Sequence, residues 1–223
     1  VSPNGQMIAF YVKERRPLAY TPSRIGVMDL ISGKIKIISK DLDDDADNLF
    51  WSKDGKSIYF AFDSRGKRTI KQISLNGDLN EVASNIGGTT IGRPYISGGF
   101  HVANGTVAYT YGRSDSPADV GVVVKDKTTV LTQLNEDILG YRKLGKVNEI
   151  TYKSSFDNEE IQGWYITPPN YDPSKKYPLI LEIHGGPHLA YGPHFSAELQ
   201  IMAASGYVVF YDNYRGSSSY GED

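Results

Sequence analysis

A short motif, His184-Gly185-Gly186-Pro187, stands directly after an apolar run over residues 179–183. Such a run is typical of a buried parallel strand, and glycines after it allow the backbone to come close to a ligand. At the end of such a strand, a backbone N–H can donate to the negatively charged oxygen of an acyl-transfer intermediate. We therefore predict that Gly186, with Gly185 as an additional donor, binds an oxyanion. The alternative is that the two glycines only permit a tight exit from the strand.

The elements around this motif follow the order strand, loop, helix, strand. Phe195, Leu199 and Met202 fall on one helical face, Gly206 lies where a helix C-cap belongs, and an apolar run over 207–211 predicts the next strand. Two further strand patterns, at 150–152 and 161–166, precede the motif. This order predicts the N-terminal part of an α/β-hydrolase domain over residues 147–223. The stretch is too short for a whole hydrolase sheet and contains no Gly-x-Ser-x-Gly nucleophile elbow, so we expect an internal segment of a larger enzyme.

Residues 1–146 contain a repeated strand pattern. Residues 1–10 and 51–60 share serine, glycine, isoleucine and phenylalanine at equivalent positions, 50 residues apart. In each copy an Asn-Gly or Asp-Gly turn leads into an alternating strand, and a second strand with its own turn follows, at Ser32-Gly33 and Asn76-Gly77. A more degenerate third unit covers strand patterns at 107–111 and 120–124. The repeat predicts a partial β-propeller of about three blades, and the alternative is a β-sandwich with coincidental turns.

The composition limits the function classes. The chain of 223 residues is 39% hydrophobic and 22% charged, which is ordinary for a globular protein. A formal net charge of −2 without a sustained basic run argues against nucleic acid and anionic membranes as partners. No apolar run approaches the length of a membrane span, and the absence of cysteine excludes disulfides and thiolate chemistry. No targeting signal is visible, and we expect a cytoplasmic protein.

Taken together, these motifs resemble the prolyl oligopeptidase family of serine peptidases, and most closely its acylaminoacyl-peptidase-like and bacterial or archaeal dipeptidyl-peptidase branch. The resemblance covers essentially the whole chain and is strongest from about residue 163 to 221. It rests on the strand-turn repeats and on the segments 131–135, 161–165, 176–180, 184–187, 205–209 and 213–217.

The resemblance implies a propeller that restricts entry to short or unfolded peptides and an α/β-hydrolase domain with a Ser-Asp-His triad. It implies a serine-type peptidase that hydrolyses short peptides or N-acylated amino acids through an acyl-enzyme. In the family the triad comes after the segment that matches residues 213–217, so this chain is expected to carry the oxyanion loop without the triad. We expect the 223-residue segment alone to be inactive.

The resemblance also gives supporting roles to four residues near the loop. The family's general base lies near the C-terminus of the full enzyme, so the resemblance does not make His184 the base. His184 is instead expected to hydrogen-bond the loop that ends in Pro187 and to hold its shape. Asn213 and Arg215 match a segment that lines and braces the active-site face, and we favour a carboxylate brace over substrate positioning for Arg215. Ser219 stands where a third glycine is usual, so Ser219 is strained if the position requires a positive φ.

The other clusters of histidines and acidic residues are interpreted without a catalytic or binding role. His184, His188 and His194 match no zinc-ligand spacing, and the acidic run over 41–47 lacks EF-hand spacing, so we interpret it as a solvated connecting loop. The adjacent pair Glu159-Glu160 sits in a predicted turn at Asp157-Asn158, and we do not give it the amine-anchoring role of the dipeptidyl peptidase IV branch. We expect no metal and no cofactor.

Two other functions stay open at this stage. A carboxylesterase-type α/β-hydrolase is possible by fold, but the propeller repeats speak against it. A non-catalytic propeller interaction module is the second alternative, and the Gly-Gly-Pro loop speaks against that. Beyond a short peptide substrate, the sequence also leaves a homo-oligomer open.

Overall fold

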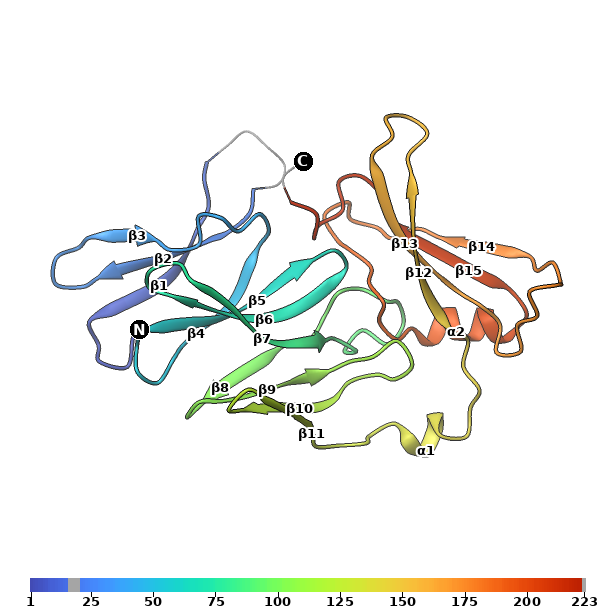
Figure 1. Cartoon of the computed structure of the whole chain (residues 1–223), viewed down its shortest axis with the longest axis horizontal. Coiled ribbons are helices and arrows are strands. Elements are labelled where there is room, and N and C mark those ends of the chain that lie inside the picture. The colour runs from blue at the N-terminus through green and yellow to red at the C-terminus, as the bar shows by residue number, and fades with distance from the viewer. Residues whose placement is uncertain (16–20, 222–223) are drawn as a thin grey trace.

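The computed structural model describes residues 1–15 and 21–221, and this part of the chain is mostly β-sheet with two short helices. Figure 1 shows β1–β11 on one side of the molecule and the last four strands, with α2 beside them, on the other. The one-turn helix α1 (Glu136–Leu139) lies in the segment that connects the two sides, and the sequence patterns did not predict it.

Two antiparallel sheets form the N-terminal side. The first has the order β1-β2-β3 and consists of β1 (Met7–Val12), β2 (Arg24–Asp29) and β3 (Ile35–Ile37). The second has the order β11-β10-β9-β7-β6-β5-β4, with β8 paired to β9. Its strands are β4 (Ala46–Trp51), β5 (Ser57–Ser64), β6 (Lys67–Ser74), β7 (Leu79–Ile86), β8 (Phe100–Ala103), β9 (Thr106–Tyr111), β10 (Asp119–Val124) and β11 (Lys127–Val130).

Strands β1, β2, β5 and β6 lie where the sequence repeat predicts them, because the turns between them depend only on neighbouring residues. The predicted turn glycines Gly5, Gly33, Gly55 and Gly77 all have positive φ, which glycine adopts without steric cost. The second sheet is continuous between β7 and β9 only through the pairing of Ile86 with Tyr111. It therefore divides into two successive groups, β4–β7 and β8–β11. One cluster of buried apolar side chains joins β2 to β4, β5 and β6, and a second cluster joins β6 and β7 to β9 and β10.

The third sheet contains the predicted parallel unit. Its order is β12-β13-β15-β14, with β12 (Val147–Lys153), β13 (Glu160–Ile166), β14 (Leu179–Glu182) and β15 (Val208–Asn213). Only β14 and β15 are parallel, and α2 (Ala197–Ala204) connects them. Leu199 and Ala203 of α2 are fully buried against Trp164 and Val209 of the sheet.

Two details of this unit correct the sequence expectations. The run predicted as a buried strand ends at Glu182, and Leu179, Leu181 and Ile183 are all more than half exposed, because β14 is an edge strand in the described part of the chain. Phe195 is buried but precedes α2, whose N-cap is Ser196. The Ser196 hydroxyl accepts a hydrogen bond from Leu199 N at 3.2 Å, and this bond ends the loop and starts the helix.

The turn between β5 and β6 packs against the third sheet. Arg65 and Gly66 both have positive φ, as a two-residue type I′ turn requires. Both turn N–H groups donate to Ser219, from Arg65 to the carbonyl oxygen at 2.7 Å and from Gly66 to Oγ at 2.8 Å. A Cβ at Gly66 would lie 2.6 Å from the ring of Trp164. The turn therefore fits the third sheet only when this residue is glycine.

We predict that Gly66→Ala lowers the free energy of unfolding by about 2–4 kcal/mol, because the methyl group collides with Trp164 and the backbone is left-handed. Gly33→Ala is the matched control, because Gly33 has a φ of +70° but its Cβ would meet nothing within 4 Å. The control should lose only about 1–2 kcal/mol. Urea denaturation of both variants measures the difference, and equal losses would show that packing on Trp164 contributes nothing.

Candidate active site

The loop after β14 presents its backbone to solvent. Gly186 has a φ of +144°, and a Cβ there would lie 2.9 Å from His188 N, so the position needs glycine. Gly185 is also exposed. Within residues 1–15 and 21–221, neither glycine N–H donates a backbone hydrogen bond. Two exposed glycines therefore follow the carboxyl end of a parallel strand, and their N–H groups have no backbone acceptor among the described residues.

His184 is buried and uses both ring nitrogens within the protein. Nδ1 lies 2.9 Å from the carbonyl oxygen of Gly185, and Nε2 lies 3.0 Å from Ser217 Oγ. The ring stacks on Tyr214 with centroids 4.5 Å apart, and the Tyr214 hydroxyl donates to the His184 carbonyl oxygen at 2.9 Å. These contacts tie the loop to the segment after β15 and leave neither nitrogen pointing to an open site.

Asn213 holds the far end of the same loop. Its Oδ1 accepts from Tyr191 N, and its Nδ2 donates to the Tyr191 carbonyl oxygen, both at 2.8 Å. Ser218 N adds a bond to the Leu189 carbonyl oxygen at 3.2 Å. Pro187 lies between these anchored ends, so the loop is fixed on both sides although it has no regular secondary structure.

Arg215 lies apart from the loop and pairs with a carboxylate. Its guanidinium forms an ion pair with Asp157 in the turn between β12 and β13. The hydrogen bond from Arg215 holds the pKa of the Asp157 carboxyl at about 2, below its ordinary value of 3.8. The contact ties the end of β15 to the neighbouring hairpin.

Ser219 has a φ of +80°, the left-handed conformation in which a serine is strained. Its hydroxyl and carbonyl oxygens both accept hydrogen bonds from the β5–β6 turn. These two bonds offset the backbone strain. The sequence indicated the strain but gave no signal for the partner, which lies 153 residues away.

The remaining histidines are not gathered into a metal site. No group of three or more His, Cys, Asp or Glu side chains with metal-binding geometry is found among the described residues. His194 is packed between two glycines, because a Cβ at Gly87 would lie 2.6 Å from its Nδ1 and one at Gly192 2.9 Å from its Nε2. Burial lowers the pKa of His194 to about 4, so the ring is neutral at pH 7.

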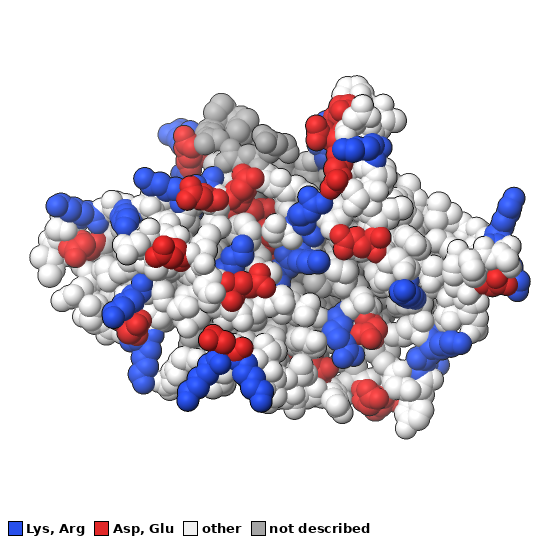
Figure 2. Space-filling view, in the orientation of Figure 1, with Lys and Arg blue, Asp and Glu red and all other residues white. Residues whose placement is uncertain are grey.

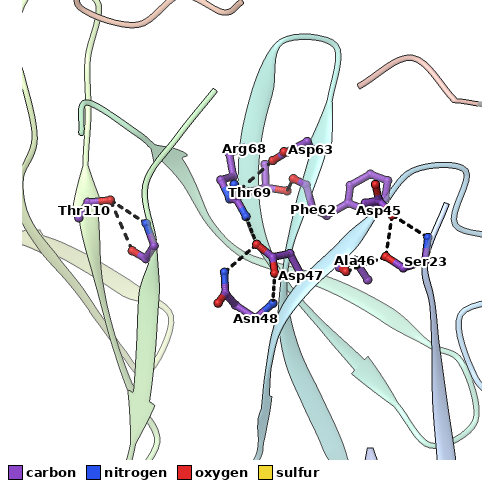
Figure 3. A network of polar contacts seen from close by, with 11 residues as sticks. Ser23, Asp45, Ala46, Asp47, Asn48, Phe62, Asp63, Arg68, Thr69 and Thr110 are labelled. Carbon is purple, nitrogen blue, oxygen red and sulfur yellow. Dashed lines mark hydrogen bonds and ion pairs between the residues drawn. The ribbon is translucent and has the colours of Figure 1, made fainter. Parts of the chain in front are cut away.

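The acidic run over 41–47 is structural rather than only a solvated loop, which corrects its interpretation from the sequence. Asp45 accepts hydrogen bonds from the N–H and hydroxyl of Ser23 at 2.7 and 2.6 Å. Asp47 lies in β4 and pairs with Arg68 of β6 at 2.6 Å, and Arg68 Nε also lies 3.6 Å from Asp63 Oδ1 (Figure 3). The run therefore connects to the residue before β2 through Asp45 and to β6 through Asp47.

Sequence reasoning missed three residues that hold the ends of the loop, namely Glu182, Tyr191 and Arg93. Glu182 accepts a hydrogen bond from the Tyr191 hydroxyl at 2.9 Å and forms an ion pair with Arg93. The one available signal was Glu182 itself, because a carboxylate within an apolar strand pattern needs a partner when it is buried. Of these residues only Arg93 is distant from the loop in the sequence, and it reaches the loop through Glu182.

Comparisons with known proteins find peptidases that are similar to this chain. No family model matches the chain. The uncharacterized peptidase YuxL of Bacillus subtilis is 29% identical over 176 residues, which are 78% of this chain and 25% of that protein. Dipeptidyl-peptidase 5 of Porphyromonas gingivalis is 26% identical over 226 residues, 99% of this chain and 32% of that protein. The structure of Pyrococcus horikoshii acylaminoacyl peptidase matches with a TM-score of 0.80 and 27% identity, over 98% of this chain and 32% of that one.

The chain is similar over most of its length to these peptidases, and the matches support a segment of a prolyl oligopeptidase-family peptidase. The resemblance predicted from the motifs is thereby confirmed. The chain spans a quarter to a third of the length of the relatives that it matches.

Helix length and the distribution of surface charge are two further properties of the described residues. None of the helices in residues 1–15 and 21–221 is long and apolar enough to cross a bilayer. On the face shown in Figure 2, basic and acidic side chains are interspersed.

Asp63 gives the structure a testable pH dependence. Burial raises the pKa of its carboxyl from 3.8 to about 6, although Arg68 opposes the shift. Between pH 4 and pH 6 the Asp63 carboxyl keeps its proton in the folded protein but loses it in the unfolded chain. The contribution of this group to the free energy of unfolding is therefore fully present below pH 4 and is lost as the pH rises through 6.

We predict that the free energy of unfolding falls by about 2–3 kcal/mol between pH 4 and 6 on account of this group, and that Asp63→Asn removes the decline. Urea denaturation across this pH range measures both proteins. A decline of the same size in the variant would assign the pH dependence to another group.

Proposed function

We propose that the chain is part of a serine peptidase that hydrolyses short peptides or N-acylated amino acids through an acyl-enzyme. One observation carries the proposal: the exposed N–H groups of Gly185 and Gly186 lie at the carboxyl end of β14 without backbone acceptors in the described chain. The peptidase names of the relatives support the reaction class.

We further propose that residues 1–146 form about three blades of a β-propeller and that 147–223 form the N-terminal part of an α/β-hydrolase domain. The successive antiparallel groups β1–β3, β4–β7 and β8–β11 support the blades. The parallel unit of β14, α2 and β15 supports the hydrolase part, since such units are built from a strand, a crossover helix and a parallel strand.

In the proposed reaction, a serine supplied from outside residues 1–223 attacks the substrate carbonyl carbon while a histidine takes the hydroxyl proton. The carbonyl oxygen then carries the negative charge, and the Gly186 N–H, with Gly185, donates to it. Collapse of this intermediate expels the amine, which takes the proton from the histidine. Water repeats the attack on the acyl carbon and releases the acid together with the serine.

The other predicted residues hold this loop in place in the proposal. His184 fixes the start of the loop through Ser217, and Asn213 fixes its end through Tyr191. Arg215 acts at a distance as a brace, since its partner Asp157 lies in the β12–β13 turn.

The proposal is tested on the natively expressed protein with a fluorophosphonate probe and peptide mapping of the adduct. A single phosphonyl adduct on a serine outside residues 1–223 is the expected result. An adduct on a serine within residues 1–223, or no adduct at all, would overturn the placement of the nucleophile. Turnover of a chromogenic peptide against a short ester then separates a peptidase from a carboxylesterase.

We predict that Gly186→Ala lowers kcat for the peptide by about 10²–10³, because a Cβ 2.9 Å from His188 N displaces the donor. Gly206→Ala is the matched control, because Gly206 also has a positive φ but lies beyond α2, where a Cβ meets nothing within 4 Å. Steady-state kinetics and thermal unfolding are measured together. Equal losses of kcat in the two variants would mean that backbone strain, and not the donor, causes the effect.

A further inference from the structure

A segment from the N-terminal side runs along the candidate oxyanion loop. Residues 91–96, between β7 and β8, form an isolated antiparallel bridge at Tyr95 and Tyr191. Ile96 N donates to the Ala190 carbonyl oxygen at 3.0 Å, and Gly192 N donates to the Pro94 carbonyl oxygen at 2.9 Å. The segment 91–96 thus serves as the hydrogen-bonding partner that the irregular backbone after the loop needs.

The same segment continues to the start of α2. Ala197 N donates to the Ile91 carbonyl oxygen at 2.8 Å, and the N-cap hydroxyl of Ser196 donates to the Gly92 carbonyl oxygen at 2.7 Å. Segment 91–96 is therefore fastened along the whole stretch from residue 190 to 197.

Arg93 lies at the centre of this segment and contacts two carboxylates. Its Nη1 forms an ion pair with Glu182, and its Nε lies 3.3 Å from Glu198 Oε2. The Glu182 side chain is only 12% exposed and also accepts the Tyr191 hydroxyl at 2.9 Å. Burial raises the pKa of the Tyr191 phenol, which keeps the proton in this hydrogen bond.

Arg93 reaches the loop over residues 183–190 through Glu182, whose carboxylate contacts both ends of the loop. Glu182 is the last residue of β14, directly before the loop, and Tyr191 is the first residue after it. The Tyr191 ring also packs on His184 with centroids 5.1 Å apart. One carboxylate, held by Arg93, therefore joins the strand end to the residue that closes the loop.

We infer that Arg93 is a positioning residue that fixes the Gly185–Gly186 donors by clamping both ends of the loop through Glu182 and Tyr191. The inference rests on the proposed function of the loop. It makes the geometry of the donors depend on docking between the N-terminal side and the third sheet, because Arg93 belongs to the first and Glu182 to the second.

Arginine suits this position better than lysine. A guanidinium presents several N–H donors in a fixed plane and reaches two carboxylates at once, whereas a lysine ammonium is a single point charge on a flexible stem. Arg93→Lys should accordingly keep only part of the effect.

The first test is hydrogen exchange of the whole protein, followed by peptide. In Arg93→Gln, amides in residues 183–190 should exchange at least about tenfold faster while the N-terminal sheets keep their protection. Arg113→Gln is the control, because Arg113 pairs with Asp115 on the surface and its side chain has no bond to the loop. Unchanged exchange in 183–190, or a uniform increase along the chain, would overturn the inference.

The second test is kinetic and uses the peptide substrate. Arg93→Gln should lower kcat by about 10- to 100-fold with little change in KM, because the donors are misplaced by a fraction of an ångström to an ångström. Arg93→Lys should recover part of the loss. An unchanged kcat, or a change confined to KM, would contradict a positioning role.

A double variant shows whether Arg93 acts through Glu182. The variant with both Arg93→Gln and Glu182→Gln should be no slower than Glu182→Gln alone, and losses that multiply would contradict the shared route. The hydrogen-exchange result does not depend on turnover. A protein that hydrolyses nothing yet shows the local exchange change would refute the proposed function and support the clamp.

Discussion

The loop between β14 and α2 must satisfy its backbone polar groups without regular secondary structure, and the rest of the molecule is arranged around this requirement. Tyr191 is fully buried, yet its N–H and carbonyl are both paired with the Asn213 side chain. A buried backbone group left without a partner costs about 1–3 kcal/mol. Segment 91–96 and the residues after β15 supply the missing partners from two sides, so the shape of the loop is a property of the assembled structure.

The N-terminal sheets and the third sheet meet through glycines that make room for rings. Gly66 accommodates Trp164, and Gly87 and Gly192 accommodate His194. The low pKa of His194 belongs with this packing, because an imidazole enclosed by backbone gives up its proton more readily than one in water. At Gly87 and Gly192 the glycine is required by the neighbour that it admits and not by its own turn geometry.

The features that follow from local signals could be predicted from the sequence. The turn glycines, the alternating strands and the parallel strand–helix–strand unit depend on neighbouring residues, and all three are present. The strain at Ser219 was expected from the family resemblance, because Ser219 stands where a glycine is usual, and its φ is positive. The catalytic roles of Gly185 and Gly186 stay predictions.

The features that depend on distant contacts could not be predicted. Nothing near Arg93 in the sequence indicates that it meets Glu182, which lies 89 residues away. The bond between Gly66 and Ser219 spans 153 residues, and the exposure of β14 depends on which strand lies beside it rather than on its apolar pattern. Sequence periodicity reports how apolar a strand is and not how many neighbours it has.

The outer edge of β14 has a consequence for the behaviour of the chain in solution. In residues 1–15 and 21–221 no strand pairs with this edge, and the side chains of Leu179, Leu181 and Ile183 beside it are exposed. An open strand edge with apolar flanks is a template for adding another strand, from any molecule that offers one. Where nothing covers this edge, we expect copies of the chain to associate edge to edge as their concentration rises. The tendency of the chain to associate then follows from what covers the outer edge of β14.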